Sequence, residues 1–461
     1  MLTFSILILI ASMIFAVTAW RRHRPRAWIF PSDALFISCL IFVGLAPLIN
    51  LRATNAYSVN YAYDDVVIAR TLFAIALMFG IFGVVWMLRR GIHVRSLMEG
   101  AVDSQNLPQL IFFGTVAACV LSAVLMIVDP DYGQFRADVL SFMTGRLNGT
   151  DYQFSRRFAF NENVLISQII SRLRYSVFAF LYAVSAAYLF SKIKNVIIPM
   201  AILTVIFFLL SSSVSKLPFV YFFMYAALIF IVLRTKSTLL RAERLLPAVI
   251  LGGVVTLIFL SGLYMVQYPD QFRGFTGTLD AFNLALYRLF GATYDGMLQY
   301  FTVYPYGMNF AYFMDSSIVA FIFDRPARDI ITEVPVYFTG EEYYGFTTTP
   351  TIFIGGAYAS AGYFGVAFYS VLVALFAVWV DEVIVRLRQA HLRVAVYATM
   401  MLNIVFFSMI AAPTVFLTYG AALIPLAALA LDGQLLRPRA KTSELEERPV
   451  APASDHVEGR V

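Results

Sequence analysis

The residues best suited to chemistry in this sequence are cations that stand where a membrane chain normally has none. Arg172 and Arg174 precede a long apolar run, Lys216 lies in the short segment SSSVSKLP, and Arg288 lies within an apolar helical pattern. A cation costs about 2.5–3.5 kcal/mol at the bilayer centre on insertion scales. Snorkelling to lipid headgroups can account for any single one. Retaining the whole set predicts a bound anion.

The anion that fits these cations is a lipid-borne pyrophosphate. Guanidinium groups bind phosphate oxygens in pairs, and an ammonium group adds a point charge. In a transferase the same cations would stabilise the charge that develops on a departing pyrophosphate. Arg136 and Arg273 lie on the same side of the expected topology and join the predicted binding set. No His, Cys and Asp constellation accompanies them, so the sequence predicts no metal and no other cofactor.

The composition indicates which elements hold these residues. The chain has 461 residues, of which 60% are hydrophobic and 13% charged, and its mean hydropathy is +0.76. Many runs reach the ~20 apolar residues that span a bilayer, whereas a barrel would alternate polar and apolar residues. This predicts an all-α polytopic membrane protein with about 11 transmembrane helices (10–12), surrounded by membrane lipids and without a nucleic-acid partner. We expect the spans near 2–20, 34–50, 66–88, 108–128, 170–190, 195–211, 217–233, 246–266, 350–380, 394–411 and 413–431.

The distribution of basic residues predicts the orientation. Most of the 34 Lys and Arg residues fall in five short connections and in the C-terminal tail. The positive-inside rule places these segments in the cytoplasm and the N-terminus outside. Residues 1–436 then form one transmembrane domain with large outer loops at 129–169 and 267–349, and the polar residues 437–461 form a disordered cytoplasmic tail. The basic connections are RRHRPR at 21–26, RRGIHVR at 89–95, SKIK at 191–194, RTKSTLLRAER at 234–244 and RLRQAHLR at 386–393.

The remaining cations all lie on the outer side of this topology. Residues 284–303 have a helical pattern, but a full span there would move RLRQAHLR to the outside. We therefore expect an interfacial or re-entrant helix at 284–303. The outer cations are Arg52, Arg70, Arg136, Arg146, Arg156, Arg157, Arg172, Arg174, Lys216, Arg273, Arg288, Arg325 and Arg328.

The segment FTTTPTIFIGGAYASAGYFG at 346–365 predicts a helix that starts at the outer face. Pro350 suits the first turn of a helix, and Thr349 can cap the free N–H groups. The positive end of such a helix favours phosphate, so Thr349 is a candidate pyrophosphate contact, with capping alone as the alternative. The glycines allow another helix or a lipid chain to approach closely, and plain helix packing accounts for them as well.

Tyrosine and phenylalanine are concentrated in the same outer segments, at 57–65, 302–315 and 336–346. An aromatic belt at the membrane interface explains part of this enrichment. Aromatic rings beside acids and arginines also suit sugar binding, where ring faces meet C–H surfaces. The candidate sugar-binding residues are Tyr304, Tyr343 and Tyr344.

Several of these pieces together resemble the O-antigen polymerase (Wzy-type) family, which polymerises oligosaccharide repeat units and is GT-C-like. The resemblance runs from about residue 130 to about residue 412 and rests on pattern and order. It nominates Arg136, Arg174, Lys216 and Arg288 for the site. The matching pieces are FRADVLS at 135–141, RLRYSVFAF at 172–180, SSSVSKLP at 211–218, ALYRLFGATYD at 285–295, the aromatic outer loop, and TTTPTIFIGGAYASAGYFGVAF at 347–368.

The resemblance implies a metal-independent membrane glycosyltransferase of the bacterial inner membrane, acting on its periplasmic face. A growing glycan would move from undecaprenyl pyrophosphate to a hydroxyl of the next lipid-linked repeat unit, for an O-antigen, capsule or exopolysaccharide. Arg288 and Lys216 would clamp the leaving pyrophosphate. Glu341, its neighbour Glu342 and Asp295 are candidates for a general base. A flippase and a chain-length regulator are the partners that the family implies.

Three alternatives stay open at this point. O-antigen ligase would transfer the glycan to lipid A core, but the ligases carry an important outer histidine and no histidine is expected outside here. A transferase with a lipid monophosphate donor would explain the adjacent acids Asp64 and Asp65, which helix capping explains as well. A flippase or transporter should place charges through the whole membrane depth, whereas the unusual cations here gather at one face.

Overall fold

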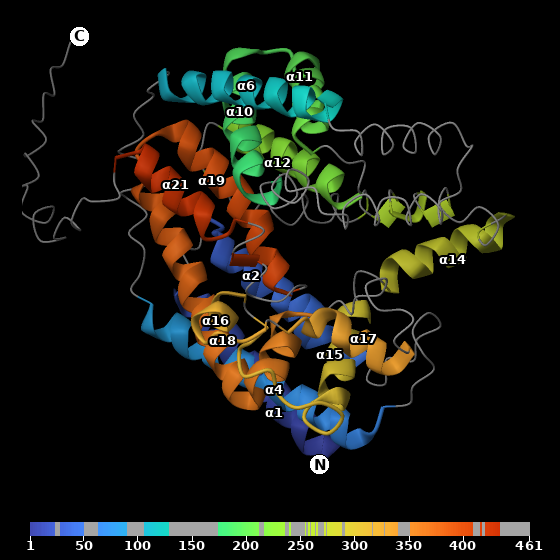
Figure 1. The fold of residues 1–461 in the computed structure, drawn as a ribbon. Coiled ribbons are helices and arrows are strands. Elements are labelled where there is room, and N and C mark those ends of the chain that lie inside the picture. The colour runs from blue at the N-terminus through green and yellow to red at the C-terminus, as the bar shows by residue number, and fades with distance from the viewer. Residues whose placement is uncertain are drawn as a thin grey trace, which may run out of the picture.

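The computed structural model is almost entirely helical in the residues that it describes (Figure 1). Within those residues, six helices are long and apolar enough to cross a membrane, and three shorter apolar helices accompany them. This confirms the prediction of an all-helical membrane protein, while the count of about 11 spans stays a prediction. The described residues are 1–23, 28–49, 63–89, 106–128, 174–211, 216–235, 239–240, 274–287, 291–315, 317–326, 328–339, 351–408, 415–416 and 420–433, with isolated positions between 254 and 272.

The six long helices are Leu2–Arg22, Pro31–Leu48, Asp65–Leu88, Asn106–Val124, Phe353–Arg386 and Ala390–Ser408. The three shorter ones are Ser176–Lys192, Ile197–Leu210 and Tyr221–Arg234. Two expectations lie outside the described residues as a whole: the loop at 129–169 and the tail at 437–461. The span expected at 413–431 contains a described helix only at Leu423–Leu431, which is shorter than a membrane crossing requires.

The elements follow one another along the chain with these bounds: α1 (Leu2–His23), α2 (Pro31–Cys39), η1 (Leu40–Leu45), α3 (Ala46–Ile49), α4 (Asp65–Leu88), α6 (Asn106–Val128), η2 (Arg174–Phe178), α10 (Ala179–Lys192), α11 (Ile197–Ser211), α12 (Lys216–Arg234), α14 (Gly274–Leu286), α15 (Ala292–Val303), α16 (Ser317–Ile322), α17 (Ile330–Thr339), α18 (Phe353–Arg386), α19 (Ala390–Asn403), η5 (Ile404–Ser408) and α21 (Leu423–Leu431).

Two groups of helices share one apolar core. Helix α1 packs along α4, and α4 packs against α18. Helix α10 packs against α6, α12 and α19, and these helices gather in the upper half of Figure 1. Helix α2 contacts both α18 and α19 and so joins the two groups. The short helices α15, α16 and α17 lie beside α4 and the lower part of α18, which places them together at one end of the long helices (Figure 1).

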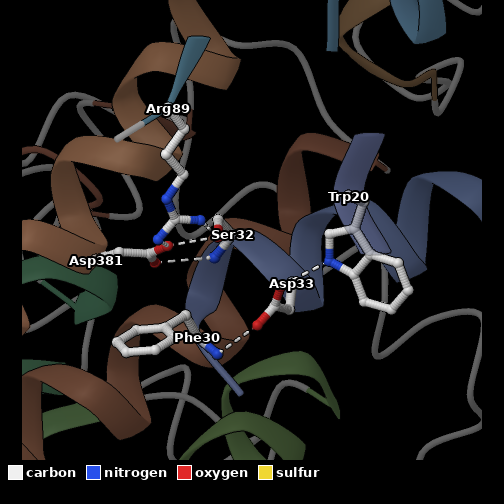
Figure 2. A network of polar contacts seen from close by, with 6 residues as sticks. All are labelled: Trp20, Phe30, Ser32, Asp33, Arg89 and Asp381. Atoms are coloured by element: carbon white, nitrogen blue, oxygen red, sulfur yellow. Dashed lines mark hydrogen bonds and ion pairs between the residues drawn. The ribbon is translucent and has the colours of Figure 1, made fainter. Parts of the chain in front are cut away.

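The start of α2 carries a buried polar network, shown in Figure 2. Phe30 is the N-cap of α2 and Pro31 follows in the first turn, where its missing N–H leaves nothing unpaired. The Asp33 carboxylate accepts hydrogen bonds from the Phe30 N–H at 2.9 Å and from Trp20 Nε1 at 2.6 Å. A carboxylate at a helix N-terminus also interacts favourably with the helix dipole. Asp33 therefore fixes the end of α1 against the start of α2.

The same helix start holds an ion pair between two further helices (Figure 2). Arg89, the C-cap residue of α4, donates from Nη2 to Asp381 of α18 at 2.7 Å and from Nη1 to Ser32 of α2 at 3.1 Å. Asp381 accepts from the Ser32 N–H at 3.1 Å and also from the Ser32 hydroxyl. Both charged side chains are almost fully buried. Helices α2, α4 and α18 thus meet at one hydrogen-bonded ion pair.

Other hydrogen bonds link further helix ends close to the start of α2 and the end of α18. The Tyr397 hydroxyl of α19 donates to the Ile29 carbonyl at 2.9 Å, and the Ile29 N–H donates to the Leu240 carbonyl at 3.1 Å. Asp432, just after α21, accepts from the Arg388 N–H at 2.8 Å. We call the end of the molecule that holds Arg89 and Asp381 the basic end, because basic residues flank it. The expected basic connections therefore lie beside helix ends that meet one another.

Candidate functional site

Helix α18 is interrupted near its start. Ala361 and Gly362 have non-helical backbone angles, and Gly362 has φ +61°, a left-handed conformation that glycine adopts without strain. The part that follows, residues 363–386, is about 36 Å long at ~1.5 Å per residue and by itself exceeds the ~30 Å hydrocarbon thickness. We call Ala361–Gly362 the α18 break. It lies 19 residues before Asp381, the α18 residue of the basic end.

The segment after α15 fills the break. The Ala311 N–H donates to the Ala359 carbonyl at 2.8 Å, and the Tyr312 N–H donates to the Ser360 carbonyl at 2.7 Å. The Ser360 hydroxyl donates to the Asp315 carboxylate at 2.7 Å. These bonds satisfy carbonyl groups that an unbroken helix would pair internally. Irregular backbone at membrane level is tolerated where protein or a water-filled cavity surrounds it, and such breaks recur at substrate sites.

Arg70 of α4 points at this break. Its Nη2 atom donates to the Tyr304 carbonyl at 3.0 Å and also to the Tyr358 hydroxyl. Its guanidinium carbon lies 5.1 Å from the centre of the Tyr306 ring and 5.5 Å from that of Tyr358. Tyr363, the first residue after the break, donates its hydroxyl to the Arg70 carbonyl at 3.3 Å. We call these five residues the Arg70 cluster.

The Arg70 cluster surrounds the guanidinium with tyrosine rings and contains no acidic side chain. Within the part of the chain that the structure describes, no carboxylate forms an ion pair with Arg70. Both of its hydrogen bonds there start at Nη2, which leaves the Nη1 and Nε hydrogens to donate separately to other acceptors. Arg70 is partly buried, so its charge is only partly solvated. A half-buried cation surrounded by tyrosines is suited to binding a phosphate or another anion.

An ion pair lies beyond Tyr304. Arg328 binds Glu333 of α17 at 2.5 Å, and its Nη1 donates to the Asn309 carbonyl at 2.9 Å. The Tyr304 hydroxyl donates to Glu333 at 3.5 Å. Burial raises the pKa of Asp315, and the hydrogen bond from Ser360 opposes that rise. The backbone of 304–315 is therefore held at both ends, by α17 and by the α18 break, which keeps it against Arg70.

Asp295 occupies a separate buried cluster at the same end. Its two carboxylate oxygens accept hydrogen bonds from the Tyr63 hydroxyl at 2.8 Å and from the Tyr287 hydroxyl at 3.1 Å. Burial, and then the Asp295 carboxylate, raise the pKa of Tyr63 above its usual range, so Tyr63 stays protonated and remains a donor. Asp295 is 3% exposed. As a general base it would need Tyr63 or Tyr287 to move aside.

Tyr304 does not present its ring for sugar binding. Its side chain is fully buried, stacked between the rings of Tyr300 and Phe310, because the 304–315 segment folds back against α15 and α17. Its contribution to the Arg70 cluster is its carbonyl oxygen instead. The expectation that Tyr304 stacks on a sugar is therefore wrong. The exposed tyrosine of that segment is Tyr306, whose side chain is 83% exposed.

The expected start of α18 also changes. The helix begins at Phe353 with Ile352 as its N-cap, and no side chain caps it. Pro350 and Thr349 thus precede the first helical turn, and the prediction that they form and cap that turn is wrong. The β-branched, apolar run after Pro350 continues in extended backbone before the helix starts, since the residues that precede a helix need no helical angles. Thr351 is buried there, and its hydroxyl has no hydrogen-bond partner.

Most of the other predicted site residues lie outside the part of the chain that can be described. Arg174 begins η2 and Lys216 begins α12, but only their backbone is described. The described parts of the helix expected at 284–303 belong to α14 and α15, and Arg288 between them lies outside the described residues. The remaining members of the predicted site are outside the described residues: Arg136, Arg172, Arg273, Arg288, Glu341, Tyr343, Tyr344 and Thr349.

The position of Arg70 in the sequence is itself unusual for a membrane span. Arg70 stands alone near the start of a long apolar span, five positions after Asp65.

Among the described residues, no group of three or more His, Cys, Asp or Glu side chains could hold a metal ion. Comparison with known proteins gives no match to any family model, to any curated protein or to any solved structure.

Proposed function

We propose that this protein is a membrane glycosyltransferase that polymerises lipid-linked oligosaccharide repeat units, as the resemblance to the O-antigen polymerases implies. The donor would be a glycan on undecaprenyl pyrophosphate, and the acceptor a hydroxyl of a second lipid-linked unit. The basic end faces the cytoplasm, so the α18 break faces the periplasm. A flippase and a chain-length regulator remain expected partners.

One observation carries the proposal: Arg70 is a half-buried guanidinium near the start of a candidate membrane span, without a carboxylate partner in the described part of the chain. A cation in that position requires an anion to offset its partial desolvation. The phosphate of a lipid carrier is presented at this depth, because its chain lies in the bilayer and its glycan in water. Arg70 can donate to its oxygens from Nη1 or Nε, which make no hydrogen bond among the described residues.

The distribution of charge favours a reaction at one face over transport. Residues 71–88 of α4 and 353–380 of α18 contain no charged residue. The charges of these two helices therefore gather near their ends. A pathway for a charged lipid headgroup would need polar groups through the membrane depth. This supports the transferase over the flippase or transporter, although it does not separate a polymerase from a ligase.

In the proposed reaction one bond breaks, one bond forms and one proton is transferred. The bond between the anomeric carbon and the pyrophosphate oxygen breaks, and its electron pair stays on undecaprenyl pyrophosphate. The acceptor oxygen forms the new bond to the anomeric carbon and loses its proton to a base. Arg70 stabilises the charge that grows on the leaving oxygens, and the fixed backbone of 304–315 keeps it in place. Asp295 remains a candidate for the base because it lies at the same end, behind Tyr63 and Tyr287.

The test is polymerisation by the purified protein. The wild type, with its native undecaprenyl-pyrophosphate repeat unit as the only substrate, should give a ladder on a gel with steps of one repeat. Arg70→Ala should lower the initial rate about 100- to 1,000-fold, the range for loss of one charge-stabilising donor. Arg325→Ala is the matched control, because Arg325 is exposed on the nearby segment after α16, and it should stay within about twofold of wild type.

Parallel reactions separate the alternatives. A ladder unchanged by EDTA is expected for a metal-independent enzyme. Glycosylation of added lipid A core, without a ladder, would identify a ligase and overturn the polymerase. Movement of the lipid-linked unit across proteoliposomes, without any larger product, would identify a transporter. Equal ladders from Arg70→Ala and wild type would remove Arg70 from the mechanism.

A further inference from the structure

An exposed aromatic surface adjoins the Arg70 cluster. The Tyr306 side chain is 83% exposed, although its ring centre lies 5.1 Å from the Arg70 guanidinium carbon. The guanidinium therefore covers only part of this ring. An exposed aromatic ring beside a bound cation offers a face on which a ligand can pack. Its contact with the cation fixes where such a ligand would lie.

A second tyrosine extends this surface. Tyr337 of α17 is 51% exposed, and its ring lies against the backbone at Gly307, the residue after Tyr306. A Cβ at Gly307 would come within 2.8 Å of the Tyr337 ring, so only glycine lets that ring lie so close. Tyr306 and Tyr337 are thus two exposed tyrosines linked through Gly307, which follows Tyr306 in the chain and contacts the Tyr337 ring. We call this pair the tyrosine shelf.

The chemistry of the shelf suits a sugar. The apolar C–H face of a pyranose packs on an aromatic ring, and its hydroxyls remain in water or reach the tyrosine hydroxyls. We propose that Tyr306 and Tyr337 form a subsite for the sugar that is attached directly to the lipid-borne phosphate held by Arg70. The inference rests on the proposed function, because Arg70 must hold that phosphate for the first sugar to reach the shelf.

The position of Arg70 selects a sugar over a lipid tail as the occupant. A headgroup phosphate bound to Arg70 has its lipid chain on the membrane side and its glycan on the water side. Tyr306 is the member of the Arg70 cluster with the most exposed side chain, whereas Tyr304 and Tyr358 are buried. Tyr306 lies in the turn after α15 and not in an apolar helix, which favours the side that the glycan takes.

The test compares two ligands that differ only in the glycan. Binding of the native undecaprenyl-pyrophosphate repeat unit and of bare undecaprenyl pyrophosphate is measured on the purified full-length protein in detergent. Tyr306→Ala should weaken binding of the glycan-bearing lipid about five- to tenfold and leave bare-lipid binding within twofold. Tyr306→Phe keeps the ring and should bind both lipids as wild type does. Gly307→Ala and Tyr337→Ala should weaken binding of the glycan-bearing lipid to a similar extent, because the added Cβ displaces the Tyr337 ring.

Phe321→Ala is the matched control. Phe321 is an aromatic residue at the same end, 86% exposed, in α16. A general interfacial role for aromatic residues predicts equal effects from Tyr306→Ala and Phe321→Ala, and that result would overturn the subsite. Equal weakening of both lipids by Tyr306→Ala would also overturn it, since the tyrosine would then act on the phosphate or the membrane.

The outcomes distinguish this inference from the proposed function. If wild type binds both lipids equally well and Tyr306→Ala changes neither, the subsite is wrong while the phosphate site stands. If wild type binds neither lipid, the proposed function falls and the subsite falls with it. A loss that is restricted to the glycan-bearing lipid supports both. Tyr306→Leu keeps most of the apolar volume without the ring, and it replaces the alanine variant if that variant fails to fold.

Discussion

The two arginines at the ends of α4 have opposite surroundings. Arg89 is buried at the basic end and bound to Asp381 and Ser32, while Arg70 is partly buried at the opposite end among tyrosines. They are about 28 Å apart along the helix at ~1.5 Å per residue, close to the ~30 Å of hydrocarbon. The same side chain thus occurs near both ends of one candidate membrane span, once with a counter-charge and once without one among the described residues.

This difference indicates different roles. The Arg89–Asp381 pair has its counter-charge in place: both Asp381 oxygens accept hydrogen bonds, and Arg89 donates from Nη1 and Nη2. A completed buried pair positions helices and leaves nothing for a ligand. Among the described residues, Arg70 Nη1 and Nε make no hydrogen bond, and the neighbours of Arg70 are aromatic rings rather than an acid. An arginine held in this way is suited to a charged ligand that arrives and leaves, such as a phosphate group.

The largest expected effect is on the complete pair. Asp381→Asn leaves the Arg89 charge buried without a counter-charge, which should lower the free energy of unfolding by about 3–5 kcal/mol. Thermal unfolding of the purified protein in detergent measures this loss. The double variant Arg89→Met with Asp381→Leu removes both charges and should recover most of the stability, since apolar residues of similar volume commonly replace such pairs without loss. A double variant as unstable as Asp381→Asn would contradict this interpretation.

A smaller effect is expected at the edge of the same network. Trp20→Phe removes the 2.6 Å hydrogen bond to Asp33 but keeps an aromatic ring against Phe36. Loss of a hydrogen bond to a charged group should lower the free energy of unfolding by about 1.5–3 kcal/mol. Asp33 still accepts from the Phe30 N–H, so its charge keeps one donor.

The control for Trp20→Phe is Trp86→Phe, which changes the same residue type at a buried indole whose Nε1 has no hydrogen-bond partner among the described residues. Chemical or thermal unfolding should show a smaller loss for Trp86→Phe than for Trp20→Phe. If the two losses are the same, the indole size rather than the Asp33 hydrogen bond accounts for the effect, and Asp33 is not the link between α1 and α2.

The fold was predictable to the extent that it depends on local composition. The long apolar runs predict α1, α4 and α18 because each must satisfy its backbone within the bilayer. The α18 break was not predicted. The glycine-rich run indicated close packing, but the break depends on Ala359 and Ser360 finding donors in a segment about 48 residues earlier, and the pattern of one helix does not contain that information.

The site was less predictable for the same reason. Arg70 could be recognised as an unusual cation, but its lack of a carboxylate depends on what α15 and α18 bring beside it. The sequence places Arg89 in the basic connection at 89–95. Asp381 stands near the end of an apolar helix, without a basic residue one helical turn away in the sequence. Their pairing joins positions 292 residues apart, and one sequence alone carries no trace of it.

The smallest expected effect completes the comparison of the two arginines. Arg70→Met loses two hydrogen bonds but also removes a partly desolvated charge that has no counter-ion in the described part of the chain. These contributions oppose each other, so the free energy of unfolding should change by about 1 kcal/mol or less. The same substitution at Arg89 strands Asp381 in the interior and should cost about 3–5 kcal/mol. Thermal unfolding of the two variants side by side gives the difference directly. Equal losses would mean that Arg70 is held by an acid outside the described residues, and the phosphate site would then lose its main support.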